Sequence, residues 1–169
     1  CTKIEEKSIW GRWQTNFELH TTFKIPENWN NQEFIVMYLP LGGIEGDFSH
    51  PEALAYIDGI PYAPCDRHHR EIQLKPEWND NREHRICLHG WTGLGYTATG
   101  DPGLKLEMGE PCLVKIHTLT RKFCSLARIT LSTIENLQND APVRNKLLNA
   151  INAAFLRLDT SHPLGDNFY

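Results

Sequence analysis

The chain has 169 residues, a length that fits one globular domain, with or without an appendage, and is enough to bury a hydrophobic core. Its formal net charge is -4 and its basic residues form no block, which argues against nucleic acid as a partner, because phosphate binding needs clustered Lys and Arg. No apolar run approaches the ~18 residues of a membrane-spanning helix, so no membrane partner is expected.

Alternating apolar and polar residues from Phe17 to Ile25 predict a half-buried antiparallel strand, which Pro26 ends. A continuous apolar run, Phe34–Leu39, predicts a second and more deeply buried strand. Asp58-Gly59 then separates two apolar runs. This pair predicts a β-hairpin with a type I′ turn, because such a turn needs φ > 0 at both central residues.

Four further short strands are predicted, at Glu71–Leu74, His84–Leu88, Leu104–Met108 and Leu113–His117. Strands of this length, broken by Gly and Pro, indicate a mainly β fold: an antiparallel β-sandwich over residues 1–117. Residues 90–103 contain five glycines and predict a long loop in this domain.

From about Thr118 the apolar period changes from 2 to 3.6, which predicts an α-helix. Asn139-Asp140 breaks that pattern, and Asp140 is the predicted cap of a second helix, with Pro142 in its first turn. We therefore expect a C-terminal α-helical hairpin that forms a helical linker over residues 118–169. Its apolar stripes either pack on each other or also dock a further domain.

The five cysteines are scattered and odd in number, and no two form a Cys-x-x-Cys pair. This pattern predicts free thiols in a reducing compartment, so we expect a cytoplasmic protein without intrachain disulfides. Cys65, which precedes Asp66 and lies near two histidines, is either an activated thiol or, more commonly for a lone cysteine, an inert buried residue.

Polar side chains are concentrated at the predicted start of the strand at Glu71. Strand alternation places His69 and Glu71 on one face, while Ile72 and Leu74 point to the core. Three interpretations remain open: a metal site, a patch that contacts sugar or a neighbouring domain, and an ordinary solvated rim. The candidate patch consists of Asp47, His50, Glu52, Asp66, His68, His69, Glu71 and Trp91.

Trp91 belongs to this candidate patch because indole faces stack on the apolar faces of sugar rings. Glu52 with Glu71 or Asp66 is the one conceivable carboxylate pair for glycoside hydrolysis. The sequence contains no nucleophile elbow, P-loop, dinucleotide fingerprint or His-Glu-x-x-His motif. We therefore assign no catalytic residue and no metal ligand to the chain.

The most distinctive segments are His50–Gly59 (HPEALAYIDG), Asp66–Glu71 (DRHHRE) and Trp91–Gly95 (WTGLG). Together they resemble the N-terminal region of family 38 α-mannosidases of the cytosolic and vacuolar type. The opening segment, Trp10–Leu39, is similar to galactose-binding-like sandwich domains of glycoside hydrolases. The helical segment that ends in Pro163–Tyr169 (PLGDNFY) is similar to the connector that leads into the catalytic domain, so the resemblance covers nearly the whole chain.

The resemblance implies a galactose-binding-like jelly roll within a larger retaining α-mannosidase, which hydrolyses terminal α-mannosyl residues with an aspartate nucleophile and a zinc ion. The family's metal motif, His-x-His-x-Asp, does not occur in this sequence. No catalytic or zinc-binding residue of the family is therefore carried over to any position here. The zinc is expected in a catalytic domain that this chain lacks.

The resemblance therefore predicts a non-catalytic N-terminal domain that serves in domain packing or oligomer assembly and borders the active site. Its expected partners are the catalytic domain of its own larger chain, mannosides, and a second copy in a homo-oligomer. The alternative is a free-standing carbohydrate-binding module. A reading frame that continues past Tyr169 into His-x-His-x-Asp would favour the first prediction, and a stop codon there the second.

Overall fold

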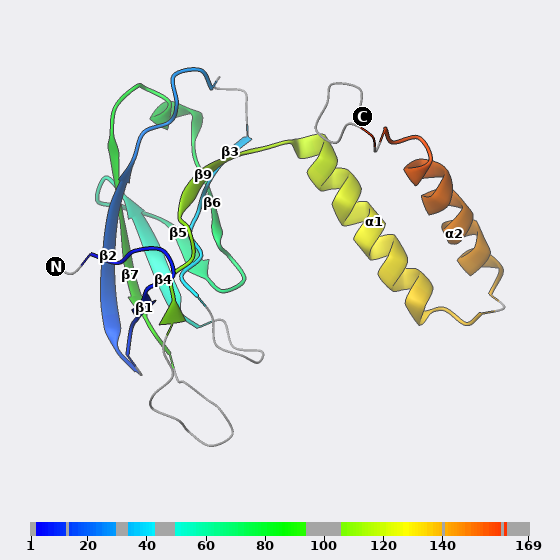
Figure 1. The fold of residues 1–169 in the computed structure, drawn as a ribbon, viewed down its shortest axis with the longest axis horizontal. Coiled ribbons are helices and arrows are strands. Elements are labelled where there is room, and N and C mark those ends of the chain that lie inside the picture. The colour runs from blue at the N-terminus through cyan, green and yellow to red at the C-terminus, as the bar shows by residue number, and fades with distance from the viewer. Residues whose placement is uncertain are drawn as a thin grey trace. The chain divides into compact units, whose positions relative to one another are not determined.

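The structure is a computed structural model that describes residues 3–12, 14–29, 34–42, 50–93, 106–139, 141–159 and 161. The chain divides into two compact units, Cys1–Ile116 and His117–Tyr169. Strands make up the first unit and helices the second (Figure 1). The predicted class is confirmed: a mainly β, antiparallel sandwich is followed by an α-helical hairpin.

One layer of the sandwich is a four-stranded antiparallel sheet. In spatial order its strands are β2 (Asn16–Phe23), β7 (His84–Trp91), β4 (Glu52–Ile57) and β5 (Ile60–Asp66). Strand β2 pairs with β7 along its whole length, although the two are far apart in the sequence. A short 3-10 turn, η1 (Pro76–Trp78), precedes β7.

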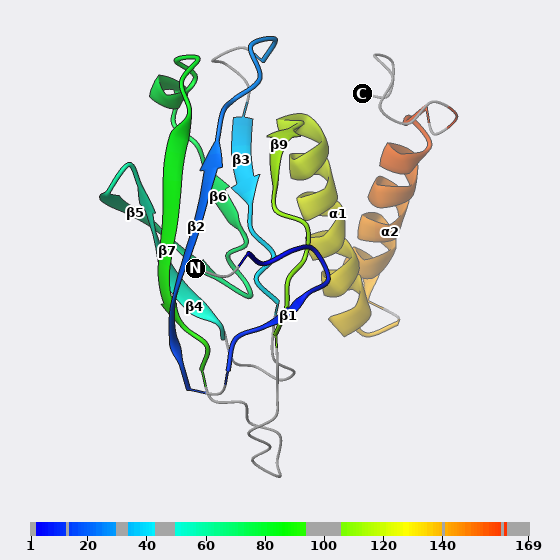
Figure 2. The same ribbon diagram turned by 60° about the vertical axis from the view of Figure 1, so that its left-hand side comes forward.

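The second layer is a three-stranded sheet in the order β6 (Glu71–Gln73), β3 (Phe34–Tyr38), β9 (Cys112–Ile116). Figure 2 shows β3 between its two neighbours, with the strands β2 and β7 in the layer beside them. A two-stranded ladder joins β1 (Ile9–Trp10) to β8 (Leu106–Glu107). The indole Nε1 of Trp10 donates a hydrogen bond to the Leu41 carbonyl at 2.9 Å, which ties this ladder to the chain that follows β3.

The core lies between the two sheets and is built from the inward residues of each strand. Ile57 and Ile86 come from the four-stranded sheet, and Ile35 and Ile72 from the other; all are buried. The predicted alternation at β6 is confirmed, since Ile72 and Leu74 are buried while Glu71 and Gln73 are exposed.

The predicted hairpin is confirmed in detail. Ile57 pairs with Ile60, so the turn has only two central residues, Asp58 and Gly59. Their φ angles are 51° and 82°, as a type I′ turn requires. The Asp58 carboxylate also accepts the backbone N–H of Arg85 at 2.9 Å, which fixes the turn against β7.

The predicted start of the loop over residues 90–103 is wrong, because β7 extends to Trp91. Gly90 and Trp91 continue β7, because the strand has ladder partners on both sides there: Asn16 on β2 and Glu52 on β4 both pair with Trp91. A glycine within a strand does not end it when backbone pairing and neighbouring side chains fill its place. Residues 94–103 lie outside the described part of the chain.

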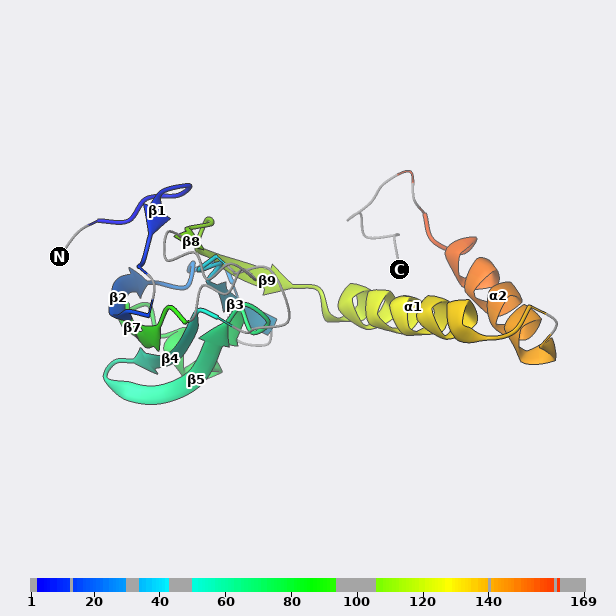
Figure 3. The ribbon, with the colours of Figure 1, turned by 90° about the horizontal axis from the view of Figure 1, so that it is seen from below.

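The helical unit contains α1 (Thr118–Asn136) and α2 (Pro142–Phe155), which lie side by side (Figure 3). The rings of Phe123 and Phe155 meet edge to face at 5.3 Å. Pro142 is in the first turn of α2, as predicted, but the N-cap is Ala141, and Asp140 lies outside the described residues.

Packing between α1 and α2 covers only part of their apolar surface, because Leu119, Leu126 and Ile129 remain exposed. Neither α1 nor α2, nor any other helix in the described residues, combines the length and apolarity that a transmembrane segment needs.

Candidate functional site

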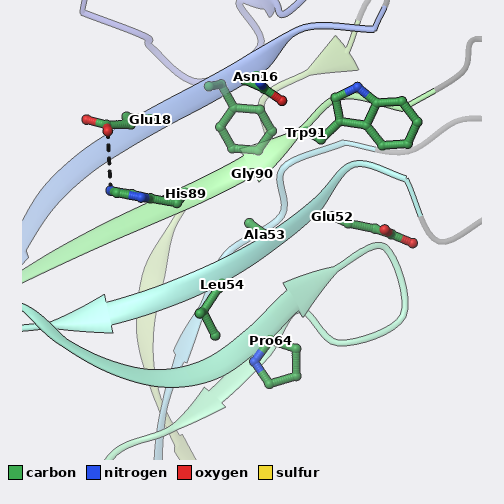
Figure 4. A pocket seen from close by; sticks show the side chains of 10 residues that line it. Asn16, Glu18, Glu52, Ala53, Leu54, Pro64, His89, Gly90 and Trp91 are labelled. Atoms are coloured by element: carbon green, nitrogen blue, oxygen red, sulfur yellow. Dashed lines mark ion pairs between the residues drawn. The ribbon is translucent and has the colours of Figure 1, made fainter.

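The outer face of the four-stranded sheet carries a shallow, open hollow of about 690 Å³ (Figure 4). It lies across all four strands of the sheet. The hollow is lined by Asn16, Phe17, Glu18, Glu52, Ala53, Leu54, Pro64, His89, Gly90 and Trp91. Of the predicted candidate patch, Glu52 and Trp91 line this hollow.

Strand register arranges the outward side chains of the hollow in rows that cross the sheet. In the first row Asn16 is opposite Trp91, Trp91 is opposite Glu52, and Glu52 is opposite Asp66. Residues that are directly paired on one face have Cβ atoms about 5 Å apart, so this row forms a continuous polar and aromatic strip. The structure thus brings three predicted residues, Glu52, Asp66 and Trp91, into one row.

Trp91 is positioned by a buried histidine. The His50 and Trp91 rings meet edge to face at 5.0 Å, and His50 is only 8% exposed. Gly93 makes room for this imidazole, because a Cβ at Gly93 would overlap the His50 ring, and its φ of 84° also favours glycine. His50 therefore packs against the indole and is not itself a lining residue of the hollow.

Asp66 closes the turn that follows β5. Its carboxylate accepts the backbone N–H groups of His68 and His69 at 2.6 and 2.7 Å, and the His69 Nδ1 lies 2.8 Å from its other oxygen. Burial raises the pKa of Asp66, but the hydrogen bonds from His69 and His68 lower it more, and the net shift is downward. A carboxylate engaged in this way remains ionised and holds the turn, which does not suit a general acid.

The remaining predicted residues are separated from the hollow. Glu71 begins β6 opposite Tyr38 and so belongs to the three-stranded sheet, whereas Asp66 belongs to the four-stranded one. His68 and His69 lie in the turn that connects the two sheets. Asp47 lies outside the described residues.

A second row, which the sequence analysis missed, contains Glu18, His89, Leu54 and Pro64. Glu18 Oε1 and His89 Nε2 are 3.3 Å apart (Figure 4). The next row places His20 opposite Cys87 and Cys87 opposite Tyr56. Alternation alone indicates that each of these polar residues faces outward, but the pairing of β2 with β7 is needed to bring them together.

Cys87 is partly exposed on this outer face, and its pKa is raised by burial and by the Glu18 charge, against a lowering effect of Arg85. Cys65 differs from it, since it is fully buried and burial raises its pKa to about 12. Of the two alternatives for Cys65, the structure supports the inert buried thiol. Cys65, Cys87, Cys112 and Cys124 are all free, as predicted, and Cys1 lies outside the described residues.

The donor groups of the hollow and its surroundings suit the recognition of a polyhydroxylated ligand. Trp91 offers an aromatic surface, and Asn16 and Glu52 offer hydrogen-bonding groups on either side of it. Comparison of the chain with protein-family models and with curated proteins gives no match.

Proposed function

We propose that this chain is a non-catalytic part of a larger family 38 α-mannosidase, and that its β unit contacts carbohydrate through the hollow on the four-stranded sheet. The single observation that carries the carbohydrate proposal is the row Asn16–Trp91–Glu52, which combines an indole with an amide and a carboxylate on one open face. Sugar rings are recognised by aromatic stacking on an apolar face and by hydrogen bonds to hydroxyl groups, and this row offers both.

The non-catalytic role is supported by the state of the carboxylate pair Glu52 and Asp66, one of the two pairs that the sequence suggested for hydrolysis. Glu52 and Asp66 are directly opposite each other, but the Asp66 carboxylate is occupied by His68 and His69. A glycosidase needs one carboxyl group that is protonated near neutral pH, and the lowered pKa of Asp66 opposes that.

Within such a larger enzyme, the helical unit would have a partner domain to contact. We propose that the helical unit docks on the catalytic domain, and the exposed Leu119, Leu126 and Ile129 of α1 supply apolar surface for such an interface. That catalytic domain would hold the zinc of the family, because this sequence lacks the His-x-His-x-Asp motif. Assembly into a homo-oligomer and a cytoplasmic location are part of the same proposal.

A second candidate function is a free-standing carbohydrate-binding module. The hollow favours it, because all of its lining residues belong to the first compact unit, Cys1–Ile116. Both functions predict sugar contact at the hollow, and they differ in whether the helical unit needs a partner domain.

Titration of the isotope-labelled chain with methyl α-mannoside and an α-linked mannobiose, followed by NMR, tests sugar contact. We expect amide shifts at Asn16, Glu52 and Trp91, with an affinity near 1 mM, about 4 kcal/mol, as befits a shallow surface. Glu52→Gln and Trp91→Phe should weaken binding.

The matched controls lie elsewhere on the same unit. Glu71→Gln removes an exposed carboxylate from the other sheet, and Trp78→Phe alters an indole that packs on Tyr62; both should leave the titration unchanged. Shifts that cluster at Glu71, or no shifts with either sugar, would contradict sugar contact at the hollow. The chain alone should not hydrolyse an aryl α-mannoside, with or without added zinc, and turnover would contradict the non-catalytic role.

A further inference from the structure

We propose that Glu18, Cys87 and His89 bind one Zn²⁺ ion on the outer face of the four-stranded sheet, and that His20 orients the Glu18 carboxylate for it. The argument for the ion does not rest on the proposed function, although Glu18 and His89 also line the hollow. It also differs from the family's catalytic zinc, whose motif the sequence lacks.

Backbone pairing fixes the positions of these side chains. Glu18 is opposite His89, and His20 is opposite Cys87, on the neighbouring antiparallel strands β2 and β7. Residues two apart on a strand share a face, so these four side chains form a square on one side of the sheet. Each corner of the square carries a group that can ligate a transition metal.

The ligand atoms already lie close together. One donor atom from each of Glu18, Cys87 and His89 can be chosen so that all lie within 4.8 Å of one another, and no other such group occurs among the described residues. Zinc bonds of about 2.0–2.3 Å place tetrahedral ligand atoms about 3.5 Å apart, so small side-chain rotations would complete the site. The Glu18 and His89 side chains are 59% and 51% exposed, so small rotations of either side chain meet solvent on the outer side.

Two neighbours restrict the histidine side chains. The Tyr56 ring lies 4.8 Å from the His89 ring and supports it on the side of β4. Arg85 Nη2 lies 3.2 Å from His20 Nδ1, and because arginine only donates, His20 must accept at Nδ1 and carry its proton on Nε2. That N–H then donates to Glu18 Oε2 at 3.3 Å.

This arrangement divides the two oxygens of Glu18 between two roles. Oε2 accepts from His20, while Oε1, 3.3 Å from His89 Nε2, faces the proposed ion. A metal-ligating carboxylate is ordinarily held by such an outer hydrogen bond. His20 is therefore a positioning residue, and its Nε2 lies 3.9 Å from Cys87 Sγ without being a ligand.

The donor set selects the metal. Thiolate and imidazole together favour zinc over calcium or magnesium, which prefer oxygen ligands. On binding, the Cys87 thiol loses its proton to solvent as the zinc–sulfur bond forms, and neutral His89 gives the lone pair of Nε2. Thiolate and carboxylate then neutralise both charges of the ion. Three protein ligands leave a fourth position for water.

An ordinary surface ion pair explains less of what is observed. A Glu–His pair at this exposure adds little to the stability of a protein, and it gives no reason for a free thiol beside the same carboxylate. The zinc site accounts for Glu18, His89 and Cys87 together.

The test uses the full chain and Co²⁺ as a spectroscopic substitute for Zn²⁺. We expect thiolate-to-cobalt charge-transfer absorption, and competition with a chromophoric chelator should give a stoichiometry of one Zn²⁺ per chain. Cys87→Ser should abolish the thiolate band. Glu18→Gln and His89→Asn should weaken Zn²⁺ binding at least ~10-fold, and His20→Asn should weaken it less while the band remains.

The controls are Cys124→Ser, which removes an exposed thiol from α1, and the double variant His68→Asn with His69→Asn, which removes two exposed histidines from the turn between β5 and β6. Both should bind Zn²⁺ as the native chain does. Circular dichroism checks that each variant is folded. If Cys87→Ser does not fold, Glu18→Gln still tests the site, because it changes only an exposed side chain. A band that survives Cys87→Ser, unchanged affinity in Glu18→Gln and His89→Asn, or loss of binding in the double variant would overturn the proposal.

Discussion

The imidazole of His84 lies 2.7 Å from the carboxylate of Asp58, which occupies the tip of the β4–β5 hairpin. The other ring nitrogen of His84 lies 3.0 Å from Asp80. Both nitrogens face carboxylates, so the ring satisfies both contacts only when it is doubly protonated. Because the His84 side chain is 3% exposed, a charged imidazolium is held inside the protein by two opposite charges.

This relationship predicts a pH-dependent stability. Burial lowers the pKa of His84, but the hydrogen bonds to Asp58 and Asp80 raise it more, and the net shift is upward. Its stabilising contribution is therefore complete below the unfolded pKa of about 6.5 and is lost as the pH rises through the higher folded value. The hydrogen bonds that Asp58 accepts from His84 and from the Arg85 amide lower the pKa of Asp58. The stabilisation that the Asp58 carboxylate provides is therefore present above about pH 4 and is lost as the pH falls through its lower folded pKa.

Asp58→Asn tests the interaction between Asp58 and His84. Asparagine is also favoured in a type I′ turn, and its Oδ1 can still accept the backbone N–H of Arg85, so the variant keeps the turn. We expect a loss of about 2 kcal/mol in the free energy of unfolding near pH 6, since a charged hydrogen bond is removed. Urea unfolding of both proteins across pH 5 to 9 gives the measurement. The difference should shrink at higher pH, and a constant difference would mean that His84 does not change its protonation state between pH 5 and 9.

Gly90 forms part of the floor of the hollow, and replacing it should destabilise the sheet. A Cβ at this position would overlap the Phe17 ring and lie 2.5 Å from the Glu52 carbonyl oxygen. Gly90→Ala should therefore cost about 3 kcal/mol, because the β4–β7 ladder would have to move. Thermal and urea unfolding measure the loss.

Gly59→Ala is the matched control. Nothing lies within 4 Å of a Cβ there, and only the φ of 82° opposes alanine, so a cost of about 1 kcal/mol is expected. Equal losses in the two variants would mean that the space around Gly90 can relax.

Asp66 should matter for folding and Glu71 should not. Asp66→Ala removes the acceptor for the His68 and His69 amides and should lower the free energy of unfolding by about 2 kcal/mol. Glu71→Ala alters an exposed residue at the start of β6 and should change the melting temperature very little. If Glu71→Ala instead unfolds the chain, the residue is structural and an interface role for it fails.

The cysteines should differ strongly in reactivity. Cys65 is fully buried, its pKa is raised to about 12, and its Sγ lies 3.9 Å from the Leu39 carbonyl. The native protein at pH 8 should therefore alkylate at the exposed Cys124 and leave Cys65 unmodified, as peptide mass spectrometry would detect. Denatured, unreduced protein should titrate five thiols, one for each cysteine of the sequence. Rapid modification of native Cys65 would contradict its burial.

Local chemistry in the sequence was enough to predict several elements. Asp58-Gly59 specifies its own turn, because only a few residues tolerate positive φ at both positions. The change of period at Thr118 predicted α1, and Pro142 marked the first turn of α2, because backbone preference acts over a few neighbouring residues. The inward Ile72 of β6 followed from alternation alone.

Tertiary structure alone decided which outward residues meet. Glu18 and His89 are distant in the sequence, and His84 reaches Asp58 only because β4 and β7 pair in one register. Glu71, predicted to accompany Asp66, lies in the other sheet because the turn between them crosses the sandwich. Alternation tells which face a residue takes, but strand order and register depend on burying two sheets against each other, and no local segment determines that balance.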